Sequence, residues 1–149
     1  MLTAKQTPEQ CAVEIVSVVP QVVRFLRSQM RQGDASLSLS QLRVLNYLKR
    51  CPQASLTDVS EYLDVTRATM SATIERLVQR GLVERIEDPQ ERRRVILSLT
   101  PTGEQQLQQV LQRTRSQVAQ KLDNFSDEQL QQLLQGLWLL RQAFEETDP

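Results

Sequence analysis

The stretch that decides the fold is residues 55–99, with the sequence SLTDVSEYLDVTRATMSATIERLVQRGLVERIEDPQERRRVILSL. Its first part favours a short helix, because Ser55, Thr57 and Asp58 are residue types that cap and open helices. We expect this helix to run through Leu63. Its apolar side chains should then turn inward, namely Val59, Tyr62 and Leu63.

A second helix is predicted over residues 67–79, directly after a tight turn at residues 64–65. Thr66 is a suitable N-cap, and Gly81 stands where a glycine commonly ends a helix. Two short helices joined by a turn form a helix-turn-helix pattern. One side of the second helix is apolar at helical spacing, with Met70, Ile74, Leu77 and Val78.

The pattern changes after this helix to partly alternating, β-branched segments at residues 82–86 and 95–99. A charged segment, residues 87–94, separates them. Such runs predict the two strands of a hairpin with a protruding charged tip. A hairpin that follows a helix-turn-helix directly makes it a winged one.

Helical spacing also occurs before this module. It predicts a helix over residues 8–31, with Pro20 expected to kink or split it and Gly33-Asp34 closing it. Ser40 is the expected N-cap of the next helix, which ends near Cys51-Pro52.

After the hairpin, Thr100-Pro101 begins another long helix. Ser126 and Gln129 then form a capping box before the last helix. The flanking helices carry more large apolar side chains than one small winged module can cover. This excess favours a homodimer in which the flanking helices pair.

The predicted fold class is mainly α with a small antiparallel β-hairpin wing, a winged helix-turn-helix module flanked by dimerisation helices. We expect a single domain over residues 1–149. Within it, the dimerisation helices should occupy residues 1–36 and 101–149, and the DNA-binding module residues 37–100.

Composition excludes several classes of function. The 149 residues are 40% hydrophobic and 24% charged, which is typical of a globular chain rather than a disordered one. Histidine is absent, which removes the commonest general base and the commonest metal ligand. The two cysteines cannot form a disulfide framework or a four-ligand zinc site. We therefore expect a cytoplasmic protein without enzyme activity, metal, cofactor or membrane span.

Charge is uneven along the chain although its total is zero. Residues 41–100 carry ten bases and eight acids, whereas residues 101–149 carry four bases and seven acids. The middle is therefore the part suited to a polyanion. Burial of the apolar side of the second predicted helix leaves small, hydroxylated and basic side chains outward, which suits entry into a DNA major groove. The candidate contacts there are Thr66, Arg67, Thr69, Ser71 and Arg76.

A cationic patch at the shoulder of the hairpin adds to this face. It consists of Arg92, Arg93 and Arg94, and it suits a phosphate backbone or a narrow minor groove. Both features have an ordinary alternative interpretation. The outward helix face is then solvated surface, and the three arginines pair with the neighbouring acids Glu87, Asp88 and Glu91.

Several motifs between Leu39 and Gly103 occur in a characteristic order. They include Arg80-Gly81-Leu82-Val83-Glu84-Arg85, then Asp88-Pro89-Gln90-Glu91-Arg92-Arg93, then Leu99-Thr100-Pro101-Thr102-Gly103. In this combination the chain resembles the MarR family of bacterial transcriptional regulators. The resemblance is dense over residues 39–103 and extends over both flanks by helix order alone.

The resemblance implies a homodimer with interleaved terminal helices, whose two winged modules bind a pseudo-palindromic operator in double-stranded DNA. It implies that the helix from Arg67 to Arg76 enters the major groove and that Arg93 enters the minor groove. Asp88 and Glu91 are the wing-orienting acids, and Glu91 stands where the family usually has aspartate. We expect a sequence-specific regulator that acts as a repressor.

Members of the family often respond to small phenolic or anionic effectors in a cleft beside the dimer helices. A similar effector could release this chain from DNA. The candidate lining residues are Arg24, Phe25, Gln29, Met30 and Tyr47, for each of which interhelix packing is the alternative.

Two other functions stay open. Some relatives sense peroxide through a cysteine in the first helix, but Cys11 is followed by Ala12-Val13 and has no adjacent cation to favour its thiolate. The chain could instead be a winged-helix protein–protein interaction module that does not bind DNA. Such a module would show an acidic or apolar second helix, whereas this one is hydroxyl-rich and carries two arginines.

Overall fold

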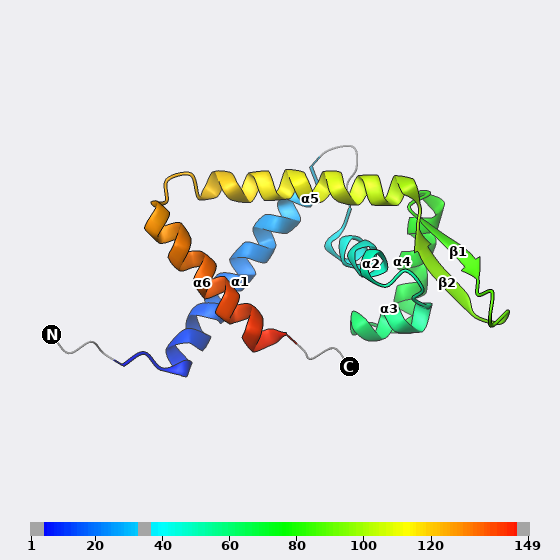
Figure 1. The fold of residues 1–149 in the computed structure, drawn as a ribbon, viewed down its shortest axis with the longest axis horizontal. Helices are drawn as coiled ribbons and strands as arrows, with labels where there is room; N and C mark the ends of the chain where they lie inside the picture. Colours follow the sequence, from blue (N-terminus) through cyan, green and yellow to red (C-terminus); the bar gives the residue numbers. More distant parts are fainter. Residues whose placement is uncertain (1–4, 33–36, 146–149) are drawn as a thin grey trace. The chain divides into compact units, whose positions relative to one another are not determined.

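The computed structural model describes residues 5–32 and 37–145. The described chain holds six helices and one two-stranded antiparallel sheet (Figure 1). It divides into two compact units, residues 1–114 and 115–149. The predicted fold class, mainly α with a hairpin wing, is confirmed.

The first helix, α1 (Pro8–Met30), begins at a capping box. Thr7 accepts a hydrogen bond from the backbone N–H of Gln10, whose side chain accepts one from the N–H of Thr7. The helix is continuous through Pro20, so the expectation of a split is wrong. The residue one turn earlier, Val16, is 73% exposed, so water can satisfy the carbonyl that Pro20 leaves without a donor. The predicted closure at Gly33-Asp34 lies outside the described residues.

The second helix, α2 (Leu39–Arg50), has Ser38 as its N-cap, which corrects the assignment of Ser40. Ser38 and Gln41 exchange two hydrogen bonds of 3.1 Å, from each backbone N–H to the other side chain. This reciprocal pair satisfies two of the free N–H groups at the helix start, which Ser40 cannot do from within the first turn.

The two helices of the helix-turn-helix are α3 (Leu56–Tyr62) and α4 (Arg67–Gln79). Asp64 in the turn between them has a φ of 51°. Thr66 caps α4 as predicted. Tyr62 does not face inward, because it is 47% exposed. Its ring lies against that of Tyr47 with centroids 4.5 Å apart, and its hydroxyl accepts a 2.6 Å hydrogen bond from Arg50.

The hairpin pairs β1 (Val83–Glu87) with β2 (Val95–Leu99). The first strand starts one residue later than predicted, because the backbone N–H of Leu82 takes part in the cap that follows α4. Gly81 has a φ of 71°, its N–H bonds to Val78, and the N–H of Leu82 bonds to Leu77. This is a Schellman motif, and it aims the chain directly into the hairpin.

The remaining helices are α5 (Pro101–Lys121) and α6 (Asp127–Phe144). The capping box predicted for Ser126 and Gln129 is present at the start of α6. Gly103 in the first turn of α5 lies so close to the hairpin root that a Cβ there would stand 2.0 Å from the carbonyl oxygen of Leu82. Only glycine fits at this position.

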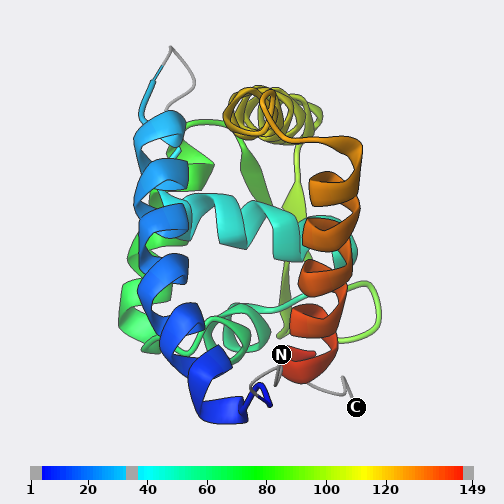
Figure 2. The same cartoon turned by 90° about the vertical axis from the view of Figure 1, so that its left-hand side faces the viewer.

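The hydrophobic core lies in the first unit and joins α2, α3 and α4 to the root of the hairpin and the first turns of α5. Figures 1 and 2 show the backbone of these elements in two views. The backbone N–H of Leu97 also bonds to the carbonyl of Ala54, which fastens β2 to the segment before α3. The core therefore fixes the hairpin relative to the helix-turn-helix. Its fully buried large side chains include Leu45, Leu48, Val59, Ile74, Leu77, Leu82, Leu97 and Leu107.

Candidate nucleic-acid interface

Helix α4 has one buried and one exposed side. Met70, Ile74 and Leu77 are buried in the core. The five predicted contact residues of this region, Thr66, Arg67, Thr69, Ser71 and Arg76, are all exposed.

The hydroxyl groups at the start of α4 form a small network. Thr66 accepts from the N–H of Thr69 and donates to the hydroxyl of Thr69, and Thr73 donates to the carbonyl of Thr69. Hydroxyl oxygens have two lone pairs, so these groups keep capacity for a further partner. The exposed side therefore offers hydroxyl groups for hydrogen bonds and carries Arg67 and Arg76 near its two ends, with Glu75 beside Arg76.

The wing tip is held by its own backbone and by Asp88. The N–H of Asp88 bonds to the carbonyl of Arg94, and the N–H of Arg94 bonds to the carbonyl of Glu91. The carboxylate of Asp88 accepts from the N–H of Gln90 at 2.9 Å, which shapes the turn. Glu91 contributes a carbonyl to this closure, and its carboxylate makes no ion pair within the described residues.

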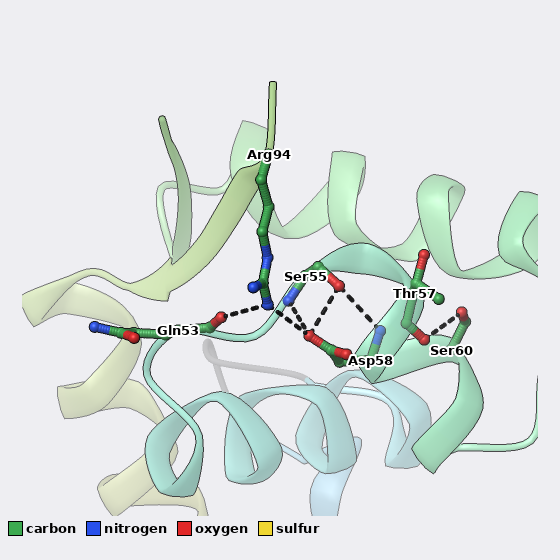
Figure 3. Close-up of polar contacts among 6 residues, drawn as sticks. All are labelled: Gln53, Ser55, Thr57, Asp58, Ser60 and Arg94. Atoms are coloured by element: carbon green, nitrogen blue, oxygen red, sulfur yellow. Dashed lines mark hydrogen bonds and ion pairs between the residues drawn. The ribbon is translucent and has the colours of Figure 1, made fainter. Parts of the chain in front are cut away.

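The three wing arginines have different surroundings. Arg92 and Arg93 are exposed, and neither pairs with an acid in the part of the chain that the structure describes. Arg94 instead reaches back to the start of α3 (Figure 3). Its Nη2 lies 3.3 Å from Oδ2 of Asp58 and 3.4 Å from the carbonyl oxygen of Gln53. The alternative interpretation, in which the three arginines pair with Glu87, Asp88 and Glu91, is therefore wrong for the described residues.

The same oxygen of Asp58 serves the capping box of α3. It accepts from the N–H of Ser55 at 2.7 Å and from the hydroxyl of Ser55 at 2.8 Å (Figure 3). The pKa of Asp58 is lowered from 3.8, first by the backbone hydrogen bond from Ser55 and then by the Ser55 hydroxyl and by Arg94, while partial burial acts in the opposite direction. Asp58 is therefore charged at neutral pH.

A second ion pair joins the hairpin to α4. Nη2 of Arg85 on β1 lies 2.8 Å from Oε2 of Glu75. Sequence reasoning assigned no role to either residue, and it treated Asp58 only as a helix opener. The alternation along β1 places Arg85 on the same side as Val83 and Glu87. That periodicity is the one signal that could have drawn attention to Arg85.

A cleft of about 580 Å³ lies between the start of α3, helix α4 and the wing. Arginines from α4 and from both sides of the hairpin reach it, and Glu91 is the acid among its lining residues. Arg85 and Arg94 are paired with Glu75 and Asp58, whereas Arg67 and Arg93 make no ion pair among the described residues. These two cations let a helix and a wing both contact one polyanion. The arginines are Arg67, Arg85, Arg93 and Arg94, and hydroxyls come from Ser55, Thr57 and Ser71.

The predicted effector residues do not line the cleft beside the wing. Met30 is buried in the core, Phe25 and Gln29 are half-buried, and Arg24 is exposed on α1. Tyr47 packs against Tyr62. A cleft of about 510 Å³ at the end of α1 and the start of α2 is lined by other residues, among them Arg27, Arg31, Ser38 and Gln41. The effector site stays a prediction.

Comparisons with known proteins agree with this geometry. Residues 35–94 match a family model described as MarR family. The HTH-type transcriptional repressor MdtR of Bacillus subtilis is 28% identical over 121 residues, covering 81% of this chain and 76% of MdtR. The chain belongs to the MarR family.

The solved structures of MarR-type proteins have the same fold. A MarR family protein from Bacillus stearothermophilus superposes with a TM-score of 0.78 at 20% identity, covering 95% of this chain and all of that one. FabT of Streptococcus pneumoniae, solved in complex with DNA, superposes with a TM-score of 0.73 at 22% identity, covering 95% of this chain and 100% of FabT.

Relatives of this MarR family member are named as transcriptional regulators. Their names confirm the prediction that the chain is a regulator rather than an enzyme. Among the described residues, no helix combines the length and the apolar character that a membrane crossing requires.

Proposed function

We propose that this MarR family member is a sequence-specific repressor that binds a pseudo-palindromic operator as a homodimer. The observation that carries the proposal is the arginine-lined cleft between α4 and the wing. A polyanion seated there meets Arg67 from α4 and Arg93 from the wing at once. Of the macromolecules that carry regularly spaced phosphates, duplex DNA presents a major groove wide enough for an α-helix.

The exposed side of α4 supports major-groove entry. Its side chains near Arg67 are short, so the helix backbone can approach the base edges closely. Arg67 and Arg76 can donate to guanine edges or phosphates, and the hydroxyls of Thr69 and Ser71 to either. Arg93 is exposed and without an acidic partner among the described residues, which suits insertion into a narrow minor groove.

The exposed apolar residues of α1 and α6 support the homodimer. On α1, Val13 and Val16 are 67% and 73% exposed, and on α6, Leu134 and Trp138 are 68% and 59% exposed. Monomeric proteins rarely expose apolar stripes of this extent. Two copies related by a two-fold axis would cover such stripes and present two winged modules to the two halves of a palindromic site.

The repressor assignment is supported by the name of MdtR, a transcriptional repressor, and DNA binding by the complex that FabT forms with DNA. A repressor needs only a site that overlaps a promoter. The proposal therefore requires no contact with the transcription machinery.

Selection from a pool of random duplexes tests the proposal and identifies the operator in the same experiment. We expect the wild-type protein to enrich one pseudo-palindromic sequence. Fluorescence anisotropy should then show that this duplex binds at least about 10³-fold more tightly than a scrambled one at the same salt concentration. Sedimentation equilibrium should give a dimer. Enrichment of no sequence, with equal binding to both duplexes, would refute the proposal.

A further inference from the structure

Two ion pairs join the wing to the two helices of the helix-turn-helix. Arg85 on β1 pairs with Glu75 on α4, and Arg94, directly before β2, pairs with Asp58 on α3. The two acids lie on different helices, so the pairs tie the wing to both of them. The hairpin root is already fixed by the core, but the tip projects beyond it. Among the described residues, Arg94 is the tip residue whose side chain bonds to the helix-turn-helix.

Arg94 is bonded through both its backbone and its side chain. Its carbonyl accepts from Asp88 and its N–H donates to Glu91, which closes the tip on itself. Its guanidinium meets Asp58 and the carbonyl of Gln53, which ties the closed tip to α3 (Figure 3). The Arg94–Asp58 link therefore helps to fix the position of the neighbouring Arg93 relative to α3.

The Arg94–Asp58 link contributes little to global stability. The two side chains are 43% and 41% exposed, and partly exposed pairs of this kind stabilise proteins by about 1 kcal/mol or less. A carboxylate beside a DNA-binding cleft also repels phosphates. An acid at this place lowers DNA affinity by its charge alone, unless it improves the geometry of binding.

We propose that Arg94 is a positioning residue rather than a DNA contact: with Asp58 it holds the wing tip at a fixed distance from α3 and α4, so that Arg93 and α4 engage one DNA segment together. This inference rests on the proposed DNA-binding function. It assigns opposite roles to neighbouring arginines, with Arg93 facing DNA and Arg94 facing the protein.

The direction in which Asp58→Asn changes DNA affinity distinguishes a positioning role from simple charge effects. Asp58→Asn keeps an oxygen that can accept from Ser55, so the cap of α3 survives, but it removes the charge that holds Arg94. Simple electrostatics predicts tighter DNA binding, because a negative charge is lost. The positioning role predicts weaker binding to the selected operator duplex, by about two- to fivefold, with no loss of affinity for the scrambled duplex.

Arg94→Gln provides the second variant, because it leaves the α3 cap untouched. It should weaken operator binding by a similar factor, and the double variant Asp58→Asn/Arg94→Gln should be no weaker than either single one, since all three lose the same link. Glu104→Gln is the matched control. It breaks the Lys49–Glu104 pair, whose 3.7 Å contact joins α2 to α5 away from the wing.

Hydrogen exchange measured without DNA distinguishes failure of the Arg94–Asp58 link from failure of the proposed DNA-binding function. Hydrogen exchange at the amides of Asp88 and Arg94 should quicken in Asp58→Asn and in Arg94→Gln but not in Glu104→Gln. Unchanged exchange would overturn the link itself, whatever the DNA result. Faster exchange in a protein that selects no duplex would refute the proposed function, and the DNA role of the link with it.

Three DNA results would overturn the inference. The first is tighter operator binding by Asp58→Asn. The second is an equal loss of affinity for both duplexes in Arg94→Gln, with a salt dependence shallower by about one phosphate contact, which would make Arg94 a direct contact. The third is additive loss in the double variant.

Discussion

Substitution of Gly103 by alanine tests the packing that fixes the wing to α5. A Cβ at this position would stand 2.0 Å from the carbonyl oxygen and 2.9 Å from the carbonyl carbon of Leu82. Both are backbone atoms of a residue that is fully buried. They cannot move aside as a flexible side chain would, so the first turn of α5 and the hairpin root must separate.

Two hydrogen bonds join the residue before α5 to the hairpin root. The N–H of Thr100 bonds to the carbonyl of Leu82 at 3.1 Å, and the hydroxyl of Thr100 bonds to the carbonyl of Gly81 at 2.6 Å. The bond from the N–H of Gly103 to the hydroxyl of Thr100, at 3.0 Å, lies within the start of α5 and survives if Thr100 moves with the helix. At about 1 kcal/mol each, the loss of the first two bonds costs about 2 kcal/mol. The higher helix propensity of alanine offsets about 1 kcal/mol of this cost, so the expected net loss in the free energy of unfolding is about 1 kcal/mol.

Thermal unfolding followed by circular dichroism measures this loss. For a chain of about this length, a loss of about 1 kcal/mol lowers Tm by about 2–4 °C. The matched control is Gly136→Ala in α6, where a Cβ meets nothing within 4 Å. That variant should be stabilised by up to about 1 kcal/mol, because it gains propensity without a clash. Both variants must be compared at one protein concentration, since association raises apparent stability. A Gly103→Ala protein as stable as the wild type would refute the reasoning.

Three further substitutions test the interface, the cap of α3 and the apolar stripe. Arg93→Ala should weaken binding to the selected duplex by about 1–3 kcal/mol in anisotropy, whereas Arg115→Ala, which removes the same charge from α5, should not. The folded-state pKa of Asp58 lies below 3.8, so its stabilising contribution is complete above pH 3.8 and is lost as pH falls through the folded value. In urea titrations, the stability difference between wild type and Asp58→Asn should therefore shrink below pH 3.8, and a constant difference would contradict this. Trp138→Glu should shift sedimentation toward the monomer, while Gln132→Glu, with the same added charge on α6, should leave the dimer intact.

Local signals in the sequence predicted helix α4 well. Thr66 and Gly81 mark the two ends of α4. Each end depends on a single residue type, a hydroxyl that caps the first turn and a glycine that adopts a positive φ, so each can be recognised in the sequence. The spacing of Met70, Ile74 and Leu77 determines which side is buried, and hence that Arg67 and the other predicted contacts are exposed.

Pairings between distant residues could not be predicted in this way. Arg94 and Asp58 are 36 residues apart, and no periodicity relates a residue of the wing tip to a helix cap. The sequence offered three closer acids as partners for the wing arginines, and the fold uses none of them in the described residues. The position of Tyr62 could not be predicted for the same reason, because its ring packs against Tyr47 on another helix.

The Schellman motif at Gly81 makes the lengths of α4 and the wing depend on each other. Helix α4 has 13 residues, so it spans about 20 Å from Arg67 to its end. The hairpin starts there, and five residues of strand return about 17 Å. Because the helix and the strand are of similar length, Arg93 lies near Arg67, and both line one cleft. Two residues added to each strand would carry Arg93 about 7 Å past this position. We therefore expect residues inserted into both strands, between the tip and the root, to weaken DNA binding by moving Arg93 away from Arg67.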